Sequence, residues 1–408
     1  KIDVPAEWAD AVDETEHKQL EGKPELVKMV KEILEPVGKM DGDSLPVSAF
    51  VGCADGQFEL GASAYEKRGV AVVVPHWDET KCIQCNQCAY VCPHATIRPF
   101  AMTEDEAAAA PEATRTLDAM GPKAKGMKFT MAVSPLDCMG CTNCVKVCPK
   151  GALEMVPTEQ EMDQQPVWDY MVENVSEKKE LIAANVKGSQ FKQPYLEFSG
   201  SCAGCAETSY ARLVTQLYGD RMYISNATGC SSIWGGTASI SPYTTNKESG
   251  HGPAWINSLF EDNAEHGLGM QIGYETVRAN LITKVEALKG KNADLDAVID
   301  KYLETKNNTK ANDAPAKALI AALEACGCDE AKEILKDKQY LAKKSFWIFG
   351  GDGWAYDIGY GGLDHVLASG HDVNVMVFDT EMYSNTGGQA SKASNIGEVC
   401  QFAAAGKE

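Results

Sequence analysis

The sequence predicts an α/β protein in which a parallel-sheet domain follows a smaller, cysteine-rich α+β domain. Two apolar runs, at 346–349 and 373–378, flank a helical pattern at 356–368. A strand–helix–strand unit of this kind implies a parallel sheet. Upstream, eight cysteines with regular spacing lie within 82–148. The length of 408 residues is sufficient for two or three folded units, each with its own core.

The remaining segments predict further helices and one more strand. Apolar residues recur on one face of 24–34, which predicts a helix, and the valine-rich run at 70–74 predicts a strand. Turn residues dominate 199–252, so this region is expected to be mostly loop. The other predicted helical segments are a short surface helix within 103–113, a polar connecting arm with few apolar residues over 158–195, and amphipathic helices over 265–340 interrupted by a polar linker at 307–313.

Acidic residues outnumber basic ones by 58 to 38, which gives a formal net charge of −20. Binding to nucleic-acid phosphates or to anionic lipid requires clustered positive charge, so neither partner is expected. No window approaches 18 uncharged apolar residues, so no membrane span is expected. The chain opens with Lys1, without an apolar leader, and 406–408 follow an Ala-rich stretch. We therefore expect both ends to continue in a longer protein.

The fifteen cysteines predict metal or cluster ligands. Most of them fall into tight groups, whereas a secreted disulfide scaffold would spread them more evenly. Crowded thiolates require a reducing compartment, so the expected location is the cytoplasm. The two longest groups repeat one pattern, namely Cys82-x2-Cys85-x2-Cys88-x3-Cys92-Pro93 and Cys138-x2-Cys141-x2-Cys144-x3-Cys148-Pro149.

This spacing resembles the bacterial ferredoxin signature. In that signature three closely spaced thiolates hold one [4Fe–4S] cluster, and the cysteine before proline ligates the other cluster. Zinc sites usually pair two CxxC halves across a longer gap and lack the trailing Cys-Pro, so the pattern favours iron–sulfur clusters. The predicted ligands of one cluster are Cys82, Cys85, Cys88 and Cys148. Those of the second cluster are Cys138, Cys141, Cys144 and Cys92.

A third cysteine group consists of Cys202, Cys205 and Cys230. A CxxC pair is also compatible with a redox dithiol or half of a zinc site. Beside two ferredoxin-type clusters, we expect these three cysteines to hold a third [4Fe–4S] cluster. The fourth ligand is expected beyond residue 408, because the remaining cysteines have no convincing context. These are Cys53, Cys326, Cys328 and Cys400.

Oxygen ligands follow two neighbouring strands of the predicted parallel sheet. Gly351, Asp352 and Gly353 follow the strand at 346–349, and Thr380 follows the strand at 373–378. Open α/β sheets bind ligands at the carboxyl ends of their strands. A carboxylate, a hydroxyl and one carbonyl suit Mg²⁺, which takes its other ligands from phosphate and water. The glycines allow backbone N–H groups to approach a diphosphate, although Asp-Gly is also a common turn.

Four segments together resemble pyruvate:ferredoxin oxidoreductase, a thiamine-diphosphate enzyme of anaerobic metabolism. They are the ferredoxin-type cysteine pair, 200–207, 351–362 and 379–389, and the resemblance covers essentially the whole chain. It implies an oxidoreductase that decarboxylates pyruvate with CoA to acetyl-CoA and CO₂. Electrons would pass through three [4Fe–4S] clusters to ferredoxin or flavodoxin.

The resemblance also implies roles for individual residues. It implies that Asp352, Thr380 and the carbonyl of Met382 bind Mg²⁺. It further implies that Cys230 places the third cluster beside thiamine diphosphate and that Asn385 makes a catalytic contact with substrate. The residues implied to bind the cofactor are Glu207, Cys230, Gly351, Asp352, Gly353, Trp354, Thr380, Glu381, Met382, Tyr383, Ser384 and Asn385.

The implied organisation has three parts. Residues 1–75 are a connecting segment from a preceding domain, and 76–160 are a ferredoxin-like α+β domain with two [4Fe–4S] clusters. Residues 161–408 are a parallel-sheet thiamine-diphosphate-binding domain that is incomplete at its C-terminus. The expected partners are therefore the missing N-terminal domains, which supply the rest of the substrate site, and other copies in a homo-oligomer.

Two alternatives remain open. One is a different 2-oxo acid as substrate. The other is an electron-transfer iron–sulfur subunit without thiamine chemistry, which explains the eight ferredoxin-type cysteines but not 346–389. The net charge of −20 also opposes docking of an acidic ferredoxin. Lys81, Lys146 and Lys150 are candidates for a local basic patch, although ordinary solvated lysines are the simpler interpretation.

Overall fold

A computed structural model of the chain describes residues 22–236, 240–290 and 292–408, and the chain divides into two units, Lys1–Glu59 and Leu60–Glu408. In the first unit, α1 (Pro24–Met29) continues through a π-helical turn (Val30–Leu34) into α2 (Glu35–Gly38). Leu26, Val30 and Ile33 on this helix are buried. The helix predicted at 24–34 is therefore confirmed, and it extends to Gly38. Short 3-10 turns follow at Gly42–Ser44 and Val47–Cys53.

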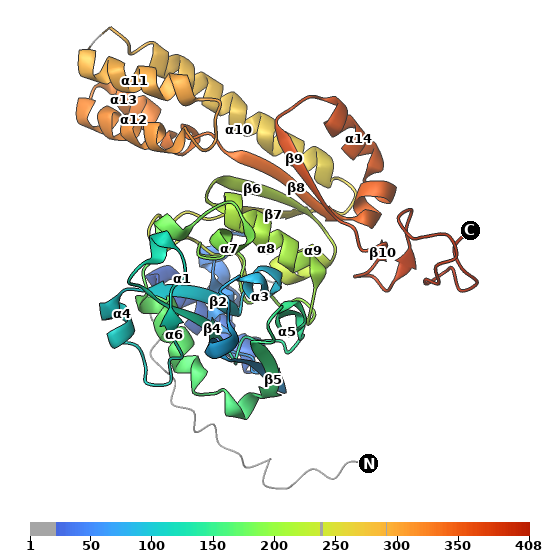
Figure 1. Ribbon diagram of the computed structural model, residues 1–408. Coiled ribbons are helices and arrows are strands. Elements are labelled where there is room, and N and C mark those ends of the chain that lie inside the picture. Colours follow the sequence, from blue (N-terminus) through green and yellow to red (C-terminus); the bar gives the residue numbers. More distant parts are fainter. Residues whose placement is uncertain (1–21, 237–239, 291) are drawn as a thin grey trace. The chain divides into compact units, whose positions relative to one another are not determined.

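Two small antiparallel sheets frame the cysteine-rich region at the start of the second unit (Figure 1). One pairs β1 (Val73–Trp77) with β5 (Leu153–Pro157). The other has the order β2–β4–β3, with bounds Ile97–Met102, Lys128–Val133 and Leu117–Asp118. Two short helices, α3 (Gln87–Val91) and α5 (Asn143–Val147), pack against each other. The predicted α+β architecture of this region is confirmed.

The strand predicted at 70–74 is displaced. It begins at Val73 and runs to Trp77, while Val70 and Val72 are exposed. Its antiparallel register with β5 ends at the pair Val73–Pro157, so the ladder does not reach the preceding valines.

The segments around the small sheets differ in detail from expectation. The surface helix within 103–113 is confirmed but short, as α4 (Glu104–Ala108), and it begins with a capping box between Thr103 and Glu106. The expectation of few apolar residues in the arm at 158–195 is wrong. Its helix α6 (Gln164–Asn174) buries Val167, Trp168 and Met171 in the core beside β4. A short helix, α7 (Val186–Ser189), follows.

A four-stranded parallel sheet with the order β7–β6–β8–β9 is the centre of the remaining chain (Figure 1). The connection from β8 to β9 runs through a π-helical segment (Gly353–Ile358) and α14 (Tyr360–Ala368). This confirms the predicted strand–helix–strand unit and the parallel α/β class. The strand bounds are Met222–Ala227 for β6, Ala254–Ser258 for β7, Ser345–Gly351 for β8 and Val373–Phe378 for β9.

The expectation that 199–252 is mostly loop is wrong in its first half. This half contains α8 (Ala206–Tyr218), the central strand β6 and α9 (Cys230–Gly235). The sequence of β6 shows no apolar run, because two of its residues, Ser225 and Asn226, are polar although both are completely buried. Ser225 donates to Asn263 Oδ1 at 2.7 Å, and Asn226 donates to Asn257 Oδ1 at 3.1 Å, so residues from other segments of the chain accept hydrogen bonds from both side chains.

The amphipathic helices predicted at 265–340 are confirmed. The long helix α10 packs on β6 and β8 and also on α13, so it connects the sheet to a small helical bundle (Figure 1). The bundle has its own apolar core, which includes Leu281, Ile299, Leu319 and Ile334. The helix bounds are Asn263–Glu286 for α10, Ala293–Thr305 for α11, Asp313–Cys326 for α12 and Asp329–Leu335 for α13.

The carboxyl ends of β8 and β9 are adjacent, because Gly351 is paired in register with Phe378. The residues that follow these two strands therefore meet at one edge of the sheet. A small hairpin of β10 (Met382–Tyr383) and β11 (Gln389–Ala390) follows β9. Within the residues that the structure describes, none of the helices combines the length and the apolar character needed to cross a membrane.

Candidate functional site

Four cysteines line one pocket between β5, α3 and the loop before α3. They are Cys82, Cys85, Cys88 and Cys148, and we call this site the Cys148 pocket. The Sγ of Cys148 accepts a hydrogen bond from the backbone N–H of Ala152 at 3.3 Å, and the Sγ of Cys88 lies 3.8 Å from the Sδ of Met131. Lys150 lies at the exposed rim of this pocket. The structure thus brings together the four residues that the sequence assigned to one cluster.

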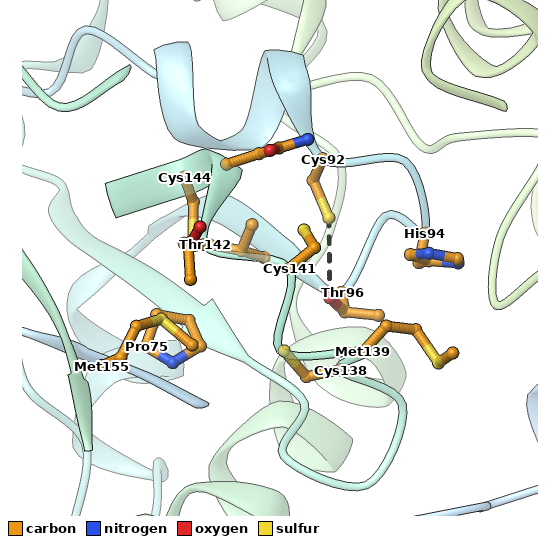
Figure 2. A pocket seen from close by; sticks show the side chains of 12 residues that line it. Pro75, Cys92, His94, Thr96, Cys138, Met139, Cys141, Thr142, Cys144 and Met155 are labelled. Atoms are coloured by element: carbon orange, nitrogen blue, oxygen red, sulfur yellow. Dashed lines mark hydrogen bonds between the residues drawn. The ribbon is translucent and has the colours of Figure 1, made fainter. Parts of the chain in front are cut away.

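The second set of four cysteines lines a separate pocket, shown in Figure 2. They are Cys92, Cys138, Cys141 and Cys144, and we call this site the Cys92 pocket. The Sγ of Cys92 lies 3.5 Å from the hydroxyl of Thr96. The imidazole of His94 also lines the pocket, on the side of Cys92 and Thr96 (Figure 2).

The two cysteine loops have the same backbone conformation. Gln84 and Asn86 in the first loop have φ angles of 55° and 59°, and Gly140 and Thr142, at the same positions of the second loop, have 65° and 68°. In both loops the residue two positions after the first cysteine donates its N–H to that sulfur at 3.4 Å. Left-handed residues at these positions make both loops turn in the same way between their cysteines.

The pockets hold their thiols in an apolar environment. Burial raises the pKa values of Cys88, Cys138 and Cys144, that of Cys138 to about 12. A buried thiolate therefore requires a positive partner, and a bound metal centre supplies one.

Arg212 lies directly behind the Cys92 pocket, and sequence reasoning missed it. This residue of α8 is 2% exposed and donates from Nε to the carbonyl of Cys92 at 2.9 Å. It also donates to the carbonyls of Ala89 and Tyr90 at the end of α3. Burial lowers the pKa of Arg212 to about 10, which leaves the guanidinium charged at neutral pH. The sequence signal that could have identified Arg212 is a cationic residue on the buried face of α8.

The third cysteine group lies next to the Cys92 pocket. The two ring nitrogens of His94 lie 3.2 Å from the carbonyl of Ser199 and 3.3 Å from the carbonyl of Cys202. A Cβ placed on Gly204 would lie 3.5 Å from the Cβ of Cys141, so the loop between Cys202 and Cys205 touches this pocket. No sequence signal placed His94 at this junction.

Cys205 and Cys202 both influence the pKa of the Cys230 thiol. Burial raises the pKa of the Cys230 thiol, the hydroxyl of Ser384 lowers it, and the other two cysteines raise it further. The Sγ of Cys230 lies 3.6 Å from the Oγ of Ser384. Cys230 is thus the member of the third cysteine group that lies at the edge of the sheet.

At this edge, three oxygen groups converge around Thr380. Its hydroxyl lies 3.2 Å from Oδ1 of Asp352 and 3.1 Å from the carbonyl of Met382. Asp352 is 1% exposed, and its other oxygen accepts a hydrogen bond from Ser391, a residue that no sequence pattern selected. The structure therefore brings together the carboxylate, the hydroxyl and the carbonyl that the resemblance implied.

The other predicted cofactor residues surround this oxygen set to different degrees. Glu207 is buried and accepts a hydrogen bond from the indole of Trp234 at 2.8 Å. Burial raises the pKa of Glu207, as does the nearby charge of Asp352. Gly353 is required as glycine, because a Cβ there would lie 2.5 Å from the ring of Tyr383.

The remaining three predicted residues have different surroundings. Trp354 is fully buried in the apolar core beneath β8. Glu381 and Asn385 are exposed on the segment around β10.

The cysteines without a predicted ligand role lie elsewhere. The Sγ atoms of Cys326 and Cys328 are 2.8 Å apart at the turn between α12 and α13, in the helical bundle. Cys53 is half-buried in the first unit, and Cys400 is buried near β11. None of these four cysteines lines either pocket.

Two sequence-family models match parts of the chain. A 4Fe-4S dicluster domain matches residues 81–152, which confirms the predicted ferredoxin-like 4Fe-4S character of this region. A domain of unknown function matches residues 13–71.

Similarity to known proteins extends over the whole chain. It is 52% identical to a pyruvate:ferredoxin oxidoreductase of Moorella thermoacetica and 49% identical to a pyruvate-flavodoxin oxidoreductase of Klebsiella pneumoniae, and each alignment covers 100% of this chain. It is also 45% identical, again over 100% of its length, to a mitochondrial pyruvate dehydrogenase [NADP(+)] of Euglena gracilis. The chain spans about 35% of the length of the first two relatives and 22% of the third. The predicted resemblance to pyruvate:ferredoxin oxidoreductase is confirmed at the level of sequence.

Proposed function

We propose that this chain is a part of a pyruvate:ferredoxin oxidoreductase that carries its electron-transfer clusters and much of its thiamine-diphosphate site. The whole reaction is oxidation of pyruvate with CoA to acetyl-CoA and CO₂, with reduction of ferredoxin or flavodoxin. The observation that carries the proposal is the continuity within one unit of two four-cysteine pockets, a third cysteine group and the oxygen set at Asp352. The full-length similarity to two relatives of this name supports it.

The two pockets fit [4Fe–4S] clusters. Each pocket is lined by three cysteines, with two residues between one cysteine and the next. Its fourth cysteine is the one that precedes proline in the other group. The backbone N–H groups that point at Cys82 and Cys138 are the contacts that stabilise cluster-bound sulfur. We assign Cys202, Cys205 and Cys230 to a third cluster, whose remaining ligand comes from outside the described residues.

The sheet edge fits Mg²⁺ and a diphosphate. Asp352, Thr380 and the carbonyl of Met382 offer one charge and three oxygen ligands, which is the small protein share that Mg²⁺ takes beside phosphate oxygens. When bound, thiamine diphosphate supplies the carbanion chemistry that decarboxylates a 2-oxo acid. Ser391 holds the Asp352 carboxylate in place from the opposite side. Glu207, buried beside Trp234, is placed to hold a proton near the cofactor, and we assign Asn385 to the substrate.

We infer the order of electron transfer from three contacts. Cys230 lies beside Ser384 at the sheet edge, and the loop of Cys202 touches the Cys92 pocket through His94 and Gly204. The helices α3 and α5, which carry Cys88 and Cys144 of the two pockets, pack against each other. Electrons would therefore pass from the third cluster to the Cys92 pocket, then to the Cys148 pocket and out to ferredoxin or flavodoxin.

The proposal requires partners beyond this chain. The domains that supply the remaining substrate contacts, other copies in a homo-oligomer, and a cytoplasmic location are part of it. A related 2-oxo acid as substrate is the alternative within the same chemistry, because this chain contributes few residues to the substrate site.

The decisive measurement is the content of iron, acid-labile sulfide and thiamine diphosphate in the anaerobically purified full-length protein. About twelve irons and one thiamine per chain support three clusters beside one thiamine site. About eight irons without thiamine would instead identify a two-cluster electron carrier and overturn the enzyme assignment.

Asp352→Ala tests the thiamine site separately. We expect loss of thiamine diphosphate and Mg²⁺ at unchanged iron content, because the variant removes the only charged ligand of the oxygen set. Asp364→Ala is the matched control, since Asp364 is an exposed carboxylate on α14. Unchanged thiamine retention in Asp352→Ala would contradict the Mg²⁺ assignment.

A further inference from the structure

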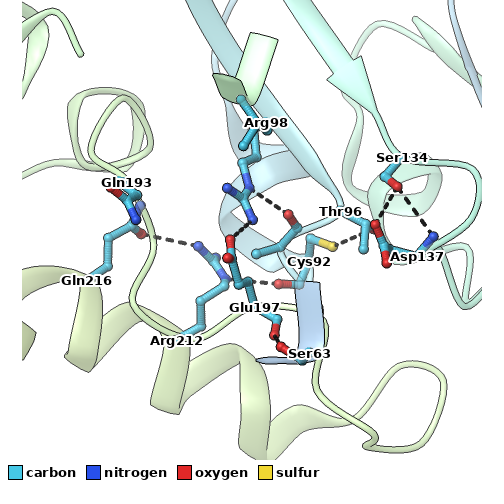
Figure 3. A network of polar contacts seen from close by, with 12 residues as sticks. Ser63, Cys92, Thr96, Arg98, Ser134, Asp137, Gln193, Glu197, Arg212 and Gln216 are labelled. Atoms are coloured by element: carbon cyan, nitrogen blue, oxygen red, sulfur yellow. Dashed lines mark hydrogen bonds and ion pairs between the residues drawn. The ribbon is translucent and has the colours of Figure 1, made fainter. Parts of the chain in front are cut away.

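Arg212 is a buried cation whose hydrogen-bond acceptors are all uncharged. It donates to the carbonyls of Cys92, Ala89 and Tyr90. Its Nη1 also donates to the side-chain amide oxygens of Gln190 and Gln216, each at 3.1 Å. Figure 3 shows Arg212 between Gln216 and Cys92, with Arg98 directed toward Glu197 instead.

A charge in this position needs a counter-charge. Removing a guanidinium from water costs several kcal/mol, and arginine does not lose its proton in proteins. Hydrogen bonds to neutral oxygens offset part of this cost. The nearby carboxylate of Glu197 is already paired with Arg98, so it does not neutralise Arg212.

The Cys92 pocket would supply the missing negative charge. A cluster held by four thiolates is negatively charged, and its charge becomes more negative by one unit on reduction. A fixed cation next to it therefore stabilises the reduced state more than the oxidised state. The same cation also fixes the backbone of Cys92 through the hydrogen bond to its carbonyl.

We propose that Arg212 is the positioning residue and the electrostatic counter-charge of the cluster in the Cys92 pocket, and that it favours reduction of this cluster over the others. The inference rests on the proposed function, because it requires a cluster at these four cysteines. It assigns the Cys92 cluster to the role of an internal electron acceptor, which draws electrons from the third cluster.

The test is a redox titration of the full-length holoenzyme, monitored by the electron paramagnetic resonance signals of the reduced clusters. Removal of Arg212 itself risks misfolding, so the decisive variant is Gln190→Glu. This substitution places a carboxylate where a neutral amide accepts from Arg212, without changing the size of the side chain. We expect the equilibrium constant for reduction of one cluster to fall at least tenfold, which is about 59 mV for a one-electron couple, while the other midpoints stay unchanged.

Gln190→Met is the matched control. It removes the same acceptor without adding charge, so its midpoints should stay at the wild-type values. Loss of about four irons in Gln190→Glu, with retention in Gln190→Met, would support the same conclusion, because glutamine and glutamate have the same shape.

Different outcomes would overturn the proposed function and the counter-charge role of Arg212. Wild-type protein without clusters would overturn the proposed function and this inference together. Full iron content with identical midpoints in wild type and Gln190→Glu would overturn the counter-charge role alone. Arg212 would then be a structural cap on α3.

Discussion

The Cys92 pocket and the Cys148 pocket share one ligand pattern but have different electrostatic surroundings. Their loops repeat each other in cysteine spacing, in left-handed residues and in N–H to sulfur contacts. Behind the Cys92 pocket, however, lies the buried guanidinium of Arg212, whereas the Cys148 pocket has the exposed Lys150 at its rim. A repeated motif therefore determines what is bound, and the residues around it determine what each copy does.

Under the proposed function, this difference corresponds to position along the electron path. The Cys92 pocket contacts the third cysteine group through His94 and Gly204, so its cation has to act from inside the protein. The Cys148 pocket is the copy with a lysine at its rim, where a surface charge can guide a soluble partner. We expect the first pocket to act as an internal relay and the second as the exit.

The largest expected effect comes from removing the remote cysteine of each pocket. Cys92→Ser and Cys148→Ser should each lose about four of about twelve irons and reduce turnover with ferredoxin at least a hundredfold. The two variants should differ in where electrons stop after pyruvate and CoA are added. In Cys148→Ser, electrons should still reach the third cluster and the Cys92 cluster. In Cys92→Ser, they should reach the third cluster alone. Rapid-freeze electron paramagnetic resonance distinguishes the two patterns.

Cys326→Ser is the control for these variants. Cys326 is exposed in the helical bundle, and its nearest sulfur is that of Cys328 at 2.8 Å. Its replacement should leave iron content and electron distribution unchanged. Identical cluster reduction in Cys92→Ser and Cys148→Ser would show that the two pockets do not act in series.

A smaller effect is expected where the two loops differ at equivalent positions. Gly140 has the position that Gln84 has in the other loop, but a Cβ on Gly140 would lie 3.0 Å from the carbonyl of Val73. Gly140→Ala should therefore cost about 1–2 kcal/mol for the left-handed conformation, plus the cost of moving that carbonyl. Thermal unfolding of the cluster-loaded protein measures the difference.

Gly126→Ala is the matched control for this prediction. Gly126 also has a positive φ angle, but no heavy atom lies within 4 Å of the position that a Cβ would take there. Gly126→Ala should therefore lower the free energy of unfolding only by the cost of the left-handed conformation. Equal destabilisation by both substitutions would show that the contact with Val73 is unimportant and that the loops tolerate the same residues.

The sequence was sufficient for features that depend on spacing along the chain. The eight ferredoxin-type cysteines, and the strand–helix–strand unit that carries Asp352 and Thr380, follow from short-range patterns, and the structure groups them as predicted. Local geometry places the three closely spaced cysteines of each pocket, and the Cys-Pro step of the other group identifies the fourth cysteine. The same holds for the amphipathic helices of the bundle, whose apolar faces repeat with the period of the helix.

The sequence was insufficient where a residue is defined by distant partners. β6 was missed because buried Ser225 and Asn226 interrupt its apolar pattern and donate hydrogen bonds to residues from other segments. Arg212 was missed because its role depends on Cys92, 120 positions earlier in the chain. Ser391 is similar, since only the fold brings it to the Asp352 carboxylate. Tertiary contacts, rather than propensity, decide such positions.

The smallest expected effect concerns the surface lysines near the exit. Lys150 lies at the rim of the Cys148 pocket, and Lys146 is exposed on α5. An acidic ferredoxin is repelled at long range by a chain with a net charge of −20, so local positive charge should dominate its approach to this pocket.

Lys146→Glu and Lys150→Glu together should raise the KM for ferredoxin several-fold at low salt while leaving kcat near the wild-type value. Lys284→Glu and Lys310→Glu together change the charge by the same four units at exposed lysines of the helical bundle region and serve as control. Steady-state kinetics at two ionic strengths measure the effect, which should shrink at high salt because screening weakens surface charges. An equal change in KM for this control would show that overall charge, rather than the rim of the Cys148 pocket, controls the encounter.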